Sequence, residues 1–488
     1  MISPLSSLSV PWSEDMFIDG ELVRGESSER LTVDNPATEE VFADFPAAST
    51  AKVGQAVESA RRAFESDAWK NRSLRREVLL TMARVLEENA EMLVASIVRE
   101  VGTPVTLARA LQIGEPIALL RAFADLTMID RDRALGIKEG SPRSDATITY
   151  QPSGVVAAIA AYNYPLLFMA TKLGGALAAG CTAVLLPSPQ APMSILLFAR
   201  LLADANIPRG VVNIIAGGIE VGQALTTHPD VNKISFTGSV GVGQQVMAQA
   251  APGLKRVALE LGGKSPSLLL PGVDIDSITD QVHARYLRNA GQGCSSPTRI
   301  LVHETQYEEF VELSQRAFSS LKIGDPWDDT VVAGPLISAK HRDRVEGYLE
   351  RAVGGGGKIV AGGGRPEMPN GWFMNGALVG GVTNKSEIAR EELFGPVGVV
   401  LPYQTVEEAI SIANDSDFGL AATIYGDIDT ARGIAPQLRV GTVMINGWIP
   451  RQDKAGGGFK MSGMGREIGE EGVREFLETQ FIAWPEPA

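Results

Sequence analysis

The sequence predicts an α/β protein with two sheet-containing domains, and three observations support this prediction. From residue 155 onward, short runs rich in β-branched residues alternate with segments whose apolar residues recur at helical spacing. A second block of the same kind begins near residue 267 and continues to about residue 446. The chain of 488 residues is long enough for both domains. Such alternation is typical of parallel, doubly wound sheets.

The elements can be assigned in chain order. The first 130 residues are predicted to be mostly helical after a short strand-like start, and residues 145–150 alternate as a strand. In the first block, the predicted strands are 155–161, 182–186, 211–215, 233–236 and 256–260, and the predicted helices are 166–179, 193–205, 220–225 and 243–250. In the second block, we expect a strand at 299–303 and helices at 275–290, 307–321 and 339–353.

Composition argues against several classes of function. There are 44 basic and 58 acidic residues, so the net charge is −14, and an acidic surface repels nucleic acid. Two cysteines cannot form a multi-disulfide framework, and the four histidines do not form a metal-binding motif. No apolar stretch is long enough for a membrane span, and the N-terminus lacks the basic region of a signal peptide. We therefore expect a cytoplasmic protein with no metal site and no membrane partner.

One glycine-rich turn is a candidate phosphate site. Ligands of parallel sheets bind where strands end and helices begin. The predicted strand 233–236 continues into Thr237-Gly238-Ser239-Val240-Gly241-Val242-Gly243 and then into a helix, so Gly238 and Ser239 could contact a phosphate. The turn lacks the complete GxGxxG pattern, and such a turn taken alone is more often a packing feature.

Three chemically capable residues occupy other loops. Cys294 lies among small residues that leave its sulfur accessible, Glu260 ends a predicted strand, and Asn163 closes another strand before a helix. Each also has an ordinary interpretation, as a buried apolar filler, a solvated surface carboxylate and a helix N-cap. For Cys181, which opens a buried strand, we keep the filler interpretation. Cys294, Glu260 and Asn163 together, beside a turn that could bind phosphate, form the arrangement that an enzyme with a thiol nucleophile requires.

Six segments in order resemble those of the NAD(P)-dependent aldehyde dehydrogenase superfamily, over essentially the whole chain. They are Asn163-Tyr164-Pro165, Phe236-Thr237-Gly238-Ser239, Glu260-Leu261-Gly262-Gly263-Lys264-Ser265-Pro266, Gly291-Gln292-Gly293-Cys294, Glu392-Leu393-Phe394-Gly395-Pro396-Val397 and Gly457-Gly458-Phe459-Lys460-Met461-Ser462-Gly463. The resemblance implies a Rossmann-like cofactor domain (1–130 and 152–262) and an α/β catalytic domain (263–466). It also implies a small β oligomerisation extension (131–151 and 467–488), and hence a homodimer or homotetramer.

The resemblance also implies catalytic roles. Cys294 would attack the aldehyde carbonyl, and the Asn163 amide with the Cys294 backbone N–H would form the oxyanion hole. Glu260 would activate water to hydrolyse the acyl-thioester. Lys172 would lie near Asn163, where a cation could stabilise negative charge. The implied cofactor-binding residues are Ser239, Gly238, Glu392, Phe394, Ser188 and Tyr162, whereas Phe459 is interpreted as core.

The sequence departs from the family pattern where the cofactor would bind. Leu186-Pro187-Ser188-Pro189 lacks the lysine and the glutamate that usually face the adenosine ribose. The family glutamate favours NAD because it repels the 2′-phosphate of NADP, and this repulsion is missing here. However, no basic residue in 185–191 would attract the phosphate either, so we expect NAD and leave NADP open. Ala161-Tyr162 also replaces the usual Pro-Trp or Pro-Phe before Asn163.

The implied substrate tunnel is mostly apolar. It would contain Phe168, Met169, Thr171, Ser295 and Trp448, a set without a cation, and this favours an aromatic or medium-chain aliphatic aldehyde. Arg451 is close enough in the sequence to weaken this argument.

Three alternative functions compete with this prediction. A CoA-acylating dehydrogenase is disfavoured by Glu260, because acylating relatives generally lack that base. A semialdehyde-specific enzyme would need a cation to bind the carboxylate of its substrate, and the implied tunnel residues include none. A non-catalytic relative is disfavoured by the complete set of Cys294, Glu260 and Asn163.

Overall fold

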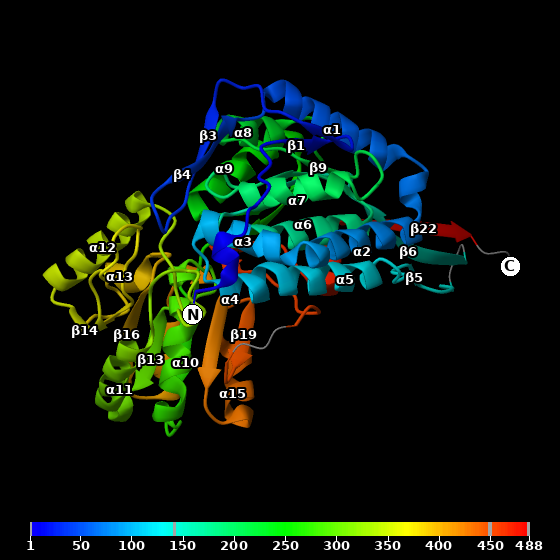
Figure 1. Cartoon of the computed structure of the whole chain (residues 1–488). Coiled ribbons are helices and arrows are strands. Elements are labelled where there is room, and N and C mark those ends of the chain that lie inside the picture. Colours follow the sequence, from blue (N-terminus) through cyan, green and yellow to red (C-terminus); the bar gives the residue numbers. More distant parts are fainter. Residues whose placement is uncertain (1, 140–142, 448–450, 486–488) are drawn as a thin grey trace.

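The computed structural model describes residues 2–139, 143–447 and 451–485, and its first sheet forms the centre of the upper part in Figure 1. The strand order of this sheet is β2-β1-β9-β8-β7-β10-β11-β21. The strands are β1 (Met16–Ile18), β2 (Glu21–Val23), β7 (Val155–Ile159), β8 (Thr182–Leu186), β9 (Val212–Ile214), β10 (Lys233–Thr237), β11 (Arg256–Glu260) and β21 (Gly463–Met464). Strands β9, β8, β7, β10 and β11 are parallel, which confirms the predicted doubly wound sheet.

The strand order reverses between β7 and β10. Strands β8 and β9 extend the sheet from one side of β7, whereas β10 and β11 extend it from the other. The loops after β7 and β10 therefore run to opposite faces and leave a crevice at the carboxyl ends of these strands, where ligands of such folds bind. The segments that contain Asn163 and Ser239 follow these two strands directly.

Helices cover both faces of this sheet (Figure 1). Contacts group α1, α8 and α9 on one face and α6 and α7 on the other, and α2, α3 and α5 pack outside the second group. Their bounds are α1 (Thr50–Glu65), α2 (Arg72–Glu88), α3 (Ala90–Val101), α5 (Glu115–Leu126), α6 (Pro165–Ala179), α7 (Met193–Ala203), α8 (Ile219–Thr227) and α9 (Val240–Ala250). The core of this part consists of buried aliphatic residues such as Leu173, Val184 and Leu196.

The second sheet has the strand order β14-β15-β16-β13-β12-β18-β19. Its strands are β12 (Pro266–Leu269), β13 (Arg299–His303), β14 (Lys358–Gly362), β15 (Ala377–Gly380), β16 (Val397–Tyr403), β18 (Ala421–Tyr425) and β19 (Thr442–Ile445). The helices of this part are α10 (Ile275–Leu287), α11 (Tyr307–Ser320), α12 (Ala339–Gly354), α13 (Glu387–Arg390), α14 (Val406–Asn414) and α15 (Ile428–Ile434). Among the described strands of this sheet, only β14 is antiparallel to its neighbour. The other strands are parallel and alternate with helices, so this is the second α/β domain that the sequence predicted.

The predicted β extension forms the arm at the right of Figure 1. Strand β22 (Leu477–Pro485) pairs antiparallel with β6 (Ser144–Pro152), and β5 (Arg133–Ala134) pairs with the other edge of β6. The expectation that the strand at 145–150 combines with a C-terminal strand is confirmed.

Two local expectations need correction. The helix predicted at 275–290 ends at Leu287, because Asn289 and Ala290 adopt left-handed backbone conformations. Residues 463–464 were placed in the catalytic domain, but they form β21 and pair with β11 of the first sheet. This pairing covers an edge of β11 that would otherwise expose backbone hydrogen-bonding groups.

Within the described ranges, no helix has both the length and the apolar character that a membrane crossing needs, and no group of three potential metal ligands is present. Cys181 and Cys294 are both free thiols. Cys181 is completely buried in the first core, as its filler interpretation requires.

Candidate active site

A cavity of about 740 Å³ opens at the carboxyl ends of β7, β8 and β10, at the switch point of the first sheet. The loops after these strands, the first turns of α8 and α9, and residues of α12 form its wall. Most of the predicted site residues meet here: Tyr162, Asn163, Phe168, Ser188, Gly238, Ser239, Cys294, Glu392 and Phe394.

Cys294 reaches the cavity by an unusual backbone path. Asn289, Ala290 and Gly291 follow α10 with φ angles of 54°, 55° and 73°. A Cβ atom on Gly263 would lie 2.3 Å from the Cys294 carbonyl oxygen. Only glycine therefore lets the turn after Glu260 pack against the cysteine loop.

The Cys294 thiol is protonated at neutral pH. Burial is the main cause that raises its pKa to about 12, and the negative charges of Glu260 and Glu392 raise it further, whereas Arg285 lowers it. Since the thiolate is the nucleophile, Cys294 needs a proton acceptor or altered surroundings before it can react.

Asn163 is held rigidly beside this thiol. Its side-chain amide donates to the Gln292 carbonyl at 2.8 Å, and its own carbonyl accepts from Gln112 at 3.3 Å and from Asn289 at 3.2 Å. The Gln292 side-chain oxygen accepts in turn from the Tyr162 hydroxyl at 3.1 Å. An amide nitrogen carries two hydrogens, so the second can point to a substrate oxygen in the cavity.

Glu260 ends β11 just behind the cavity wall, which includes the next two residues, Leu261 and Gly262. Its Oε1 is buried and has no hydrogen-bond partner in the described structure. Burial raises the pKa of Glu260 to about 8; the charge of Glu467 adds to this shift, and that of Lys172 opposes it. Such a carboxyl group can exchange protons near neutral pH.

Lys172 forms a buried ion pair that the sequence did not indicate. Its ammonium donates to Glu467 at 2.8 Å and to the Ser235 hydroxyl at 3.0 Å, and the residue is completely buried. A buried ammonium needs a carboxylate partner, and the fold brings Glu467 to it from a distant segment. The positive charge of Lys172 also lowers the pKa of Glu260.

The turn after Glu260 is fixed by residues from the second half of the chain. The Ser462 hydroxyl donates to the Gly262 carbonyl at 2.7 Å and accepts from the Gly419 N–H at 2.9 Å. The Gly263 N–H donates to the Glu392 carboxylate at 2.9 Å. Burial raises the pKa of Glu392 to about 7. The carboxylate predicted to bind a ribose is thus anchored to the turn that follows Glu260.

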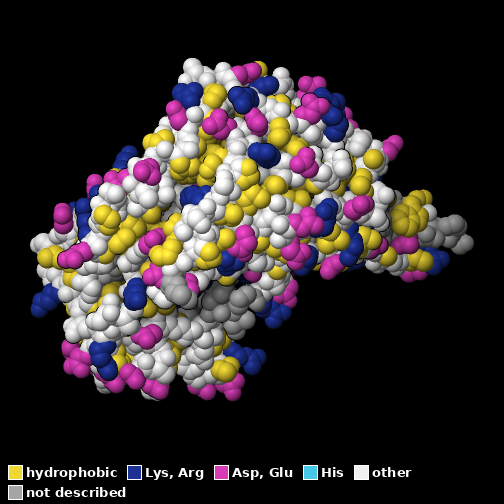
Figure 2. Space-filling view, in the orientation of Figure 1, with side chains coloured by type: hydrophobic (Ala, Val, Ile, Leu, Met, Phe, Trp, Pro, Cys, Tyr) yellow, Lys and Arg dark blue, Asp and Glu magenta, His cyan; other side chains and the backbone are white. Residues whose placement is uncertain are grey.

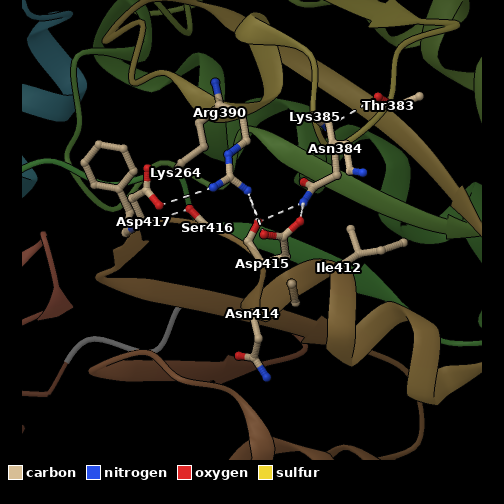
Figure 3. Close-up of polar contacts among 12 residues, drawn as sticks. Lys264, Thr383, Asn384, Lys385, Arg390, Ile412, Asn414, Asp415, Ser416 and Asp417 are labelled. Atoms are coloured by element: carbon tan, nitrogen blue, oxygen red, sulfur yellow. Dashed lines mark hydrogen bonds and ion pairs between the residues drawn. The ribbon is translucent and has the colours of Figure 1, made fainter.

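A second polar cluster supports the far side of this turn (Figure 3). Arg390 donates to Asp415 at 2.9 Å and to Asp417 at 3.2 Å, and Asn384 donates to Asp415 at 3.0 Å. Arg299 links this cluster to the turn, because its Nε donates to the Lys264 carbonyl at 3.0 Å and its terminal nitrogens bind carbonyls at the end of α14.

The opposite end of the cavity is suited to an anion. Ser239 is the N-cap of α9, and its Oγ accepts from the Val242 N–H at 3.4 Å, so its hydroxyl hydrogen can still donate to a ligand. Thr237 Oγ1 is buried in the cavity wall and has no partner among the described residues. A helix N-terminus beside an unpaired hydroxyl favours a phosphate group.

Tyr162 and Phe394 meet between these two ends. Their rings pack edge to face, with centroids 5.9 Å apart. Phe394 has a left-handed φ of 58°, and its carbonyl accepts from His341 at 2.7 Å. His341 and Arg344 of α12 also line the cavity, and no sequence motif indicated them.

The predicted substrate residues separate in the structure. Phe168 lines the cavity, but Met169 is completely buried in the core, and the Thr171 hydroxyl is bonded to the Leu167 carbonyl. Neighbouring residues on a helix point about 100° apart, so α6 directs Phe168 and Met169 to different surroundings. Trp448 lies outside the described residues.

Sequence reasoning missed the charges on the other side of the thiol. Arg285 of α10 donates to the hydroxyl of Ser295, the residue after Cys294, at 3.4 Å. Lys454 interacts electrostatically with both Arg285 and Cys294. The structure thus places two cations near the thiol that the sequence analysis did not name. Arg451, the cation considered from the sequence, is exposed and pairs with Asp453.

Comparison with known proteins agrees with this arrangement. The model of the aldehyde dehydrogenase family matches residues 22–482. Geranial dehydrogenase from Castellaniella defragrans is 36% identical, with 96% of this chain and 98% of the relative covered. The 3-succinoylsemialdehyde-pyridine dehydrogenase of a Pseudomonas species is 37% identical, with the same coverage. A solved structure of a mutant of aldehyde dehydrogenase C from Pseudomonas syringae, in complex with NAD+ and octanal, is 36% identical, with a TM-score of 0.91 and with 99% of this chain and 98% of that chain covered. By sequence and by fold, this chain belongs to the aldehyde dehydrogenase family.

Proposed function

We propose that this aldehyde dehydrogenase oxidises an aldehyde to the carboxylic acid with NAD as its cofactor. One observation carries the proposal: Cys294 and Asn163 open onto the cavity at the switch point, and the unpaired carboxyl oxygen of Glu260 lies just behind its wall. The relative from Pseudomonas syringae, which was solved with NAD+ and octanal, supports the same pair of ligand classes.

The cavity has the features that a dinucleotide needs. The unpaired Thr237 hydroxyl and the first turn of α9 would hold the pyrophosphate, and Lys340 adds a positive charge on the α12 wall. Ser188 would face the adenosine ribose. The anchored Glu392 carboxylate would accept a hydrogen bond from the second ribose, with Phe394 packed nearby. Bound there, NAD supplies the hydride acceptor.

The protein's own groups would carry the remaining chemistry. Cys294 would attack the carbonyl carbon, and the Asn163 amide with the Cys294 backbone N–H would stabilise the oxygen that becomes negative. The oxidised acyl group would remain on Cys294 as a thioester. Glu260 would then take a proton from the water that attacks it. Because the pKa of Glu260 is raised to about 8, the fraction of this base that is ionised increases as the pH rises through that value.

Glu29 supports NAD over NADP. Its carboxylate lies against Gly218, so close that a Cβ atom there would be 2.1 Å from Glu29 Oε1. Gly218 and the segment Leu186-Pro187-Ser188-Pro189 both line the cavity. A negative charge from a different part of the chain would thus oppose a 2′-phosphate, as the glutamate missing from that segment does in the family.

Water, and not CoA, is the proposed acceptor of the acyl group. Glu260 is present and carries an unpaired oxygen, and a CoA-acylating enzyme has no use for such a base. Phe168 would contact the hydrocarbon part of an aromatic or medium-chain aldehyde.

We further propose a cytoplasmic homodimer or homotetramer assembled through the β extension. Figure 2 shows hydrophobic side chains gathered on this arm, and Phe481, Ile482 and Trp484 of β22 are exposed, with 64% of Phe481 accessible. Apolar residues on an exposed edge of a sheet favour pairing with a second copy.

An absorbance assay tests the proposed reaction. Purified enzyme is mixed with one aldehyde at a time and with NAD, NADP, or NAD plus CoA, while the formation of NAD(P)H is followed. The proposal expects NADH, a carboxylic acid as product and no acyl-CoA. Appearance of acyl-CoA, or no reduced cofactor with any aldehyde, would contradict it.

A further inference from the structure

Cationic residues that do not line the cofactor cavity lie near Cys294. Arg285 lies in the last turn of α10, and Arg288 is the residue that caps the C-terminus of this helix, with a non-helical ψ of 135°. Neither is part of the cavity wall formed by the described residues. Arg285 donates to the hydroxyl of Ser295, next to the thiol.

Arg288 stands at the junction between α10 and the cysteine loop. Its Nε is buried and has no hydrogen-bond partner in the described parts of the chain. The next residue, Asn289, donates to the backbone carbonyl of Asn163 at 3.2 Å. Arg288 is therefore one residue from a direct contact with the oxyanion asparagine and has donor capacity that the described residues do not use.

Lys454 comes to the same region from the end of the chain. Two residues before it, Gln452 donates to Glu115 at 3.2 Å, and Glu115 begins α5. Gln112, just before that helix, donates to the Asn163 carbonyl. The segments 112–115, 285–295 and 452–454 thus converge beside Asn163 and Cys294.

The charges of these segments do not cancel. Burial is the main cause that lowers the pKa of Lys454, and the positive charges of Arg285 and Arg288 lower it further. The negative charge of Glu115 and the Cys294 thiol raise it. Within these segments, Arg285, Arg288 and Lys454 carry positive charge and Glu115 and Asp453 carry negative charge, so their net charge is +1 in a protein whose net charge is −14. Such a local reversal of sign attracts an anionic ligand to a place that the rest of the surface would repel.

We propose, on the basis of the proposed function, that the physiological aldehyde carries a carboxylate at the end opposite to its aldehyde group, and that Arg288, Arg285 and Lys454 bind it. Phe168 would contact the hydrocarbon between the two groups. This substrate class differs from the uncharged aldehyde that the apolar residues of the sequence favoured, because it takes account of cations that the fold gathers at the thiol.

Matched pairs of aldehydes test this proposal. Initial rates with NAD are measured for succinic semialdehyde against pentanal, and for 4-carboxybenzaldehyde against 4-methylbenzaldehyde. We expect the carboxylated member of at least one pair to have the higher kcat/KM. In Arg288→Leu, that value should fall roughly ten- to a hundredfold, mainly through KM, because a hydrogen-bonded charge is lost. The uncharged member should change little, and Arg288→Lys should recover part of the loss.

Arg451→Ala is the matched control, because it removes the same charge from a nearby exposed position. It should leave the preference unchanged. If Arg288→Leu does not fold, Lys454→Met tests the same prediction. Equal or better rates with both uncharged aldehydes, or an unchanged preference in Arg288→Leu and Lys454→Met, would overturn the proposal while the dehydrogenase function stands.

A measurement that needs no turnover separates the two proposals. The rates at which iodoacetate and iodoacetamide alkylate Cys294 are followed by mass spectrometry, with glutathione as the free-thiol reference. We expect the iodoacetate to iodoacetamide ratio to exceed that of glutathione and to fall in Arg288→Leu. If the ratio behaves in this way but the enzyme oxidises no aldehyde, the proposed function is contradicted and the anion site is still supported. A ratio equal to that of glutathione would contradict the anion site.

Discussion

The two sides of Cys294 differ in charge and in how the chain builds them. On the cofactor side, Glu260 and Glu392 raise the pKa of the thiol, whereas on the other side Arg285 lowers it. The first side comes from strand ends and tight turns that have recognisable local motifs. The second side comes from one helix end and a late segment that have none. Local motifs therefore indicate where the reactive thiol lies, but they do not indicate the charged residues on its other side.

Removing the Cys294 thiol should reduce the rate of aldehyde oxidation more than any other change, because the groups on both sides act through this thiol. Cys294→Ala should abolish NADH formation with every aldehyde, since no covalent intermediate can form. Cys181→Ala is the control: that thiol is completely buried in the first core and contacts the Phe476 carbonyl at 3.4 Å, so activity should remain. A steady-state absorbance assay measures both. Residual turnover by Cys294→Ala beyond background would place the nucleophile elsewhere.

Glu260→Gln tests the acidic side alone. We expect a loss of roughly 10²- to 10⁴-fold in steady-state turnover, the contribution of a positioned general base, while an acyl-enzyme still accumulates on Cys294. Rapid mixing with aldehyde and NAD, followed by intact mass measurement, detects this adduct. Turnover at the wild-type rate would remove Glu260 from hydrolysis, and an inactive variant without adduct would show that it acts before the thioester forms.

The pH dependence should move when the partner of Lys172 is changed. Burial raises the pKa of Glu260 to about 8, Glu467 adds to the shift and Lys172 opposes it. In Glu467→Gln, the negative charge that raises the pKa of Glu260 is lost while the positive charge of Lys172 stays, so the pKa of Glu260 falls. The rate of thioester hydrolysis, which rises with pH as Glu260 ionises, should therefore reach half its maximum at lower pH than in the wild type. Single-turnover hydrolysis measured across pH 5.5–9.5 checks this, and a shift toward higher pH would contradict the arrangement.

The smallest predicted effect is at the far end of the cofactor cavity. Glu29→Gln should raise the kcat/KM ratio of NADP to NAD by roughly two- to fivefold, the range expected when one partly exposed charge is removed. Glu14→Gln, which removes the same charge from an exposed position, should leave the ratio unchanged. Cofactor titrations with one aldehyde measure both variants. An unchanged ratio in Glu29→Gln would assign the NAD preference to another residue.

The fold was largely predictable because its signals are local. The predicted strand 256–260 coincides with β11, and the segment 233–236 differs from β10 by one residue, since β-branched runs and helical spacing depend on near neighbours. Ends of elements were less predictable. The helix predicted to reach residue 290 stops at Leu287 because the loop is held by contacts with Thr103 and Asn163, which are distant in the sequence.

The sequence by itself indicated the candidate catalytic residues Asn163, Glu260 and Cys294, because they lie in loops at the ends of local elements whose packing brings them to one edge of the sheet. The tertiary structure decided what surrounds them. It pairs Lys172 with Glu467, turns Met169 into the core, sets Glu29 against Gly218, and brings Arg285 and Lys454 to the thiol. The physical reason is that burial and the distance between charges set these interactions, and both depend on the packing of segments far apart in the chain, which no local pattern encodes.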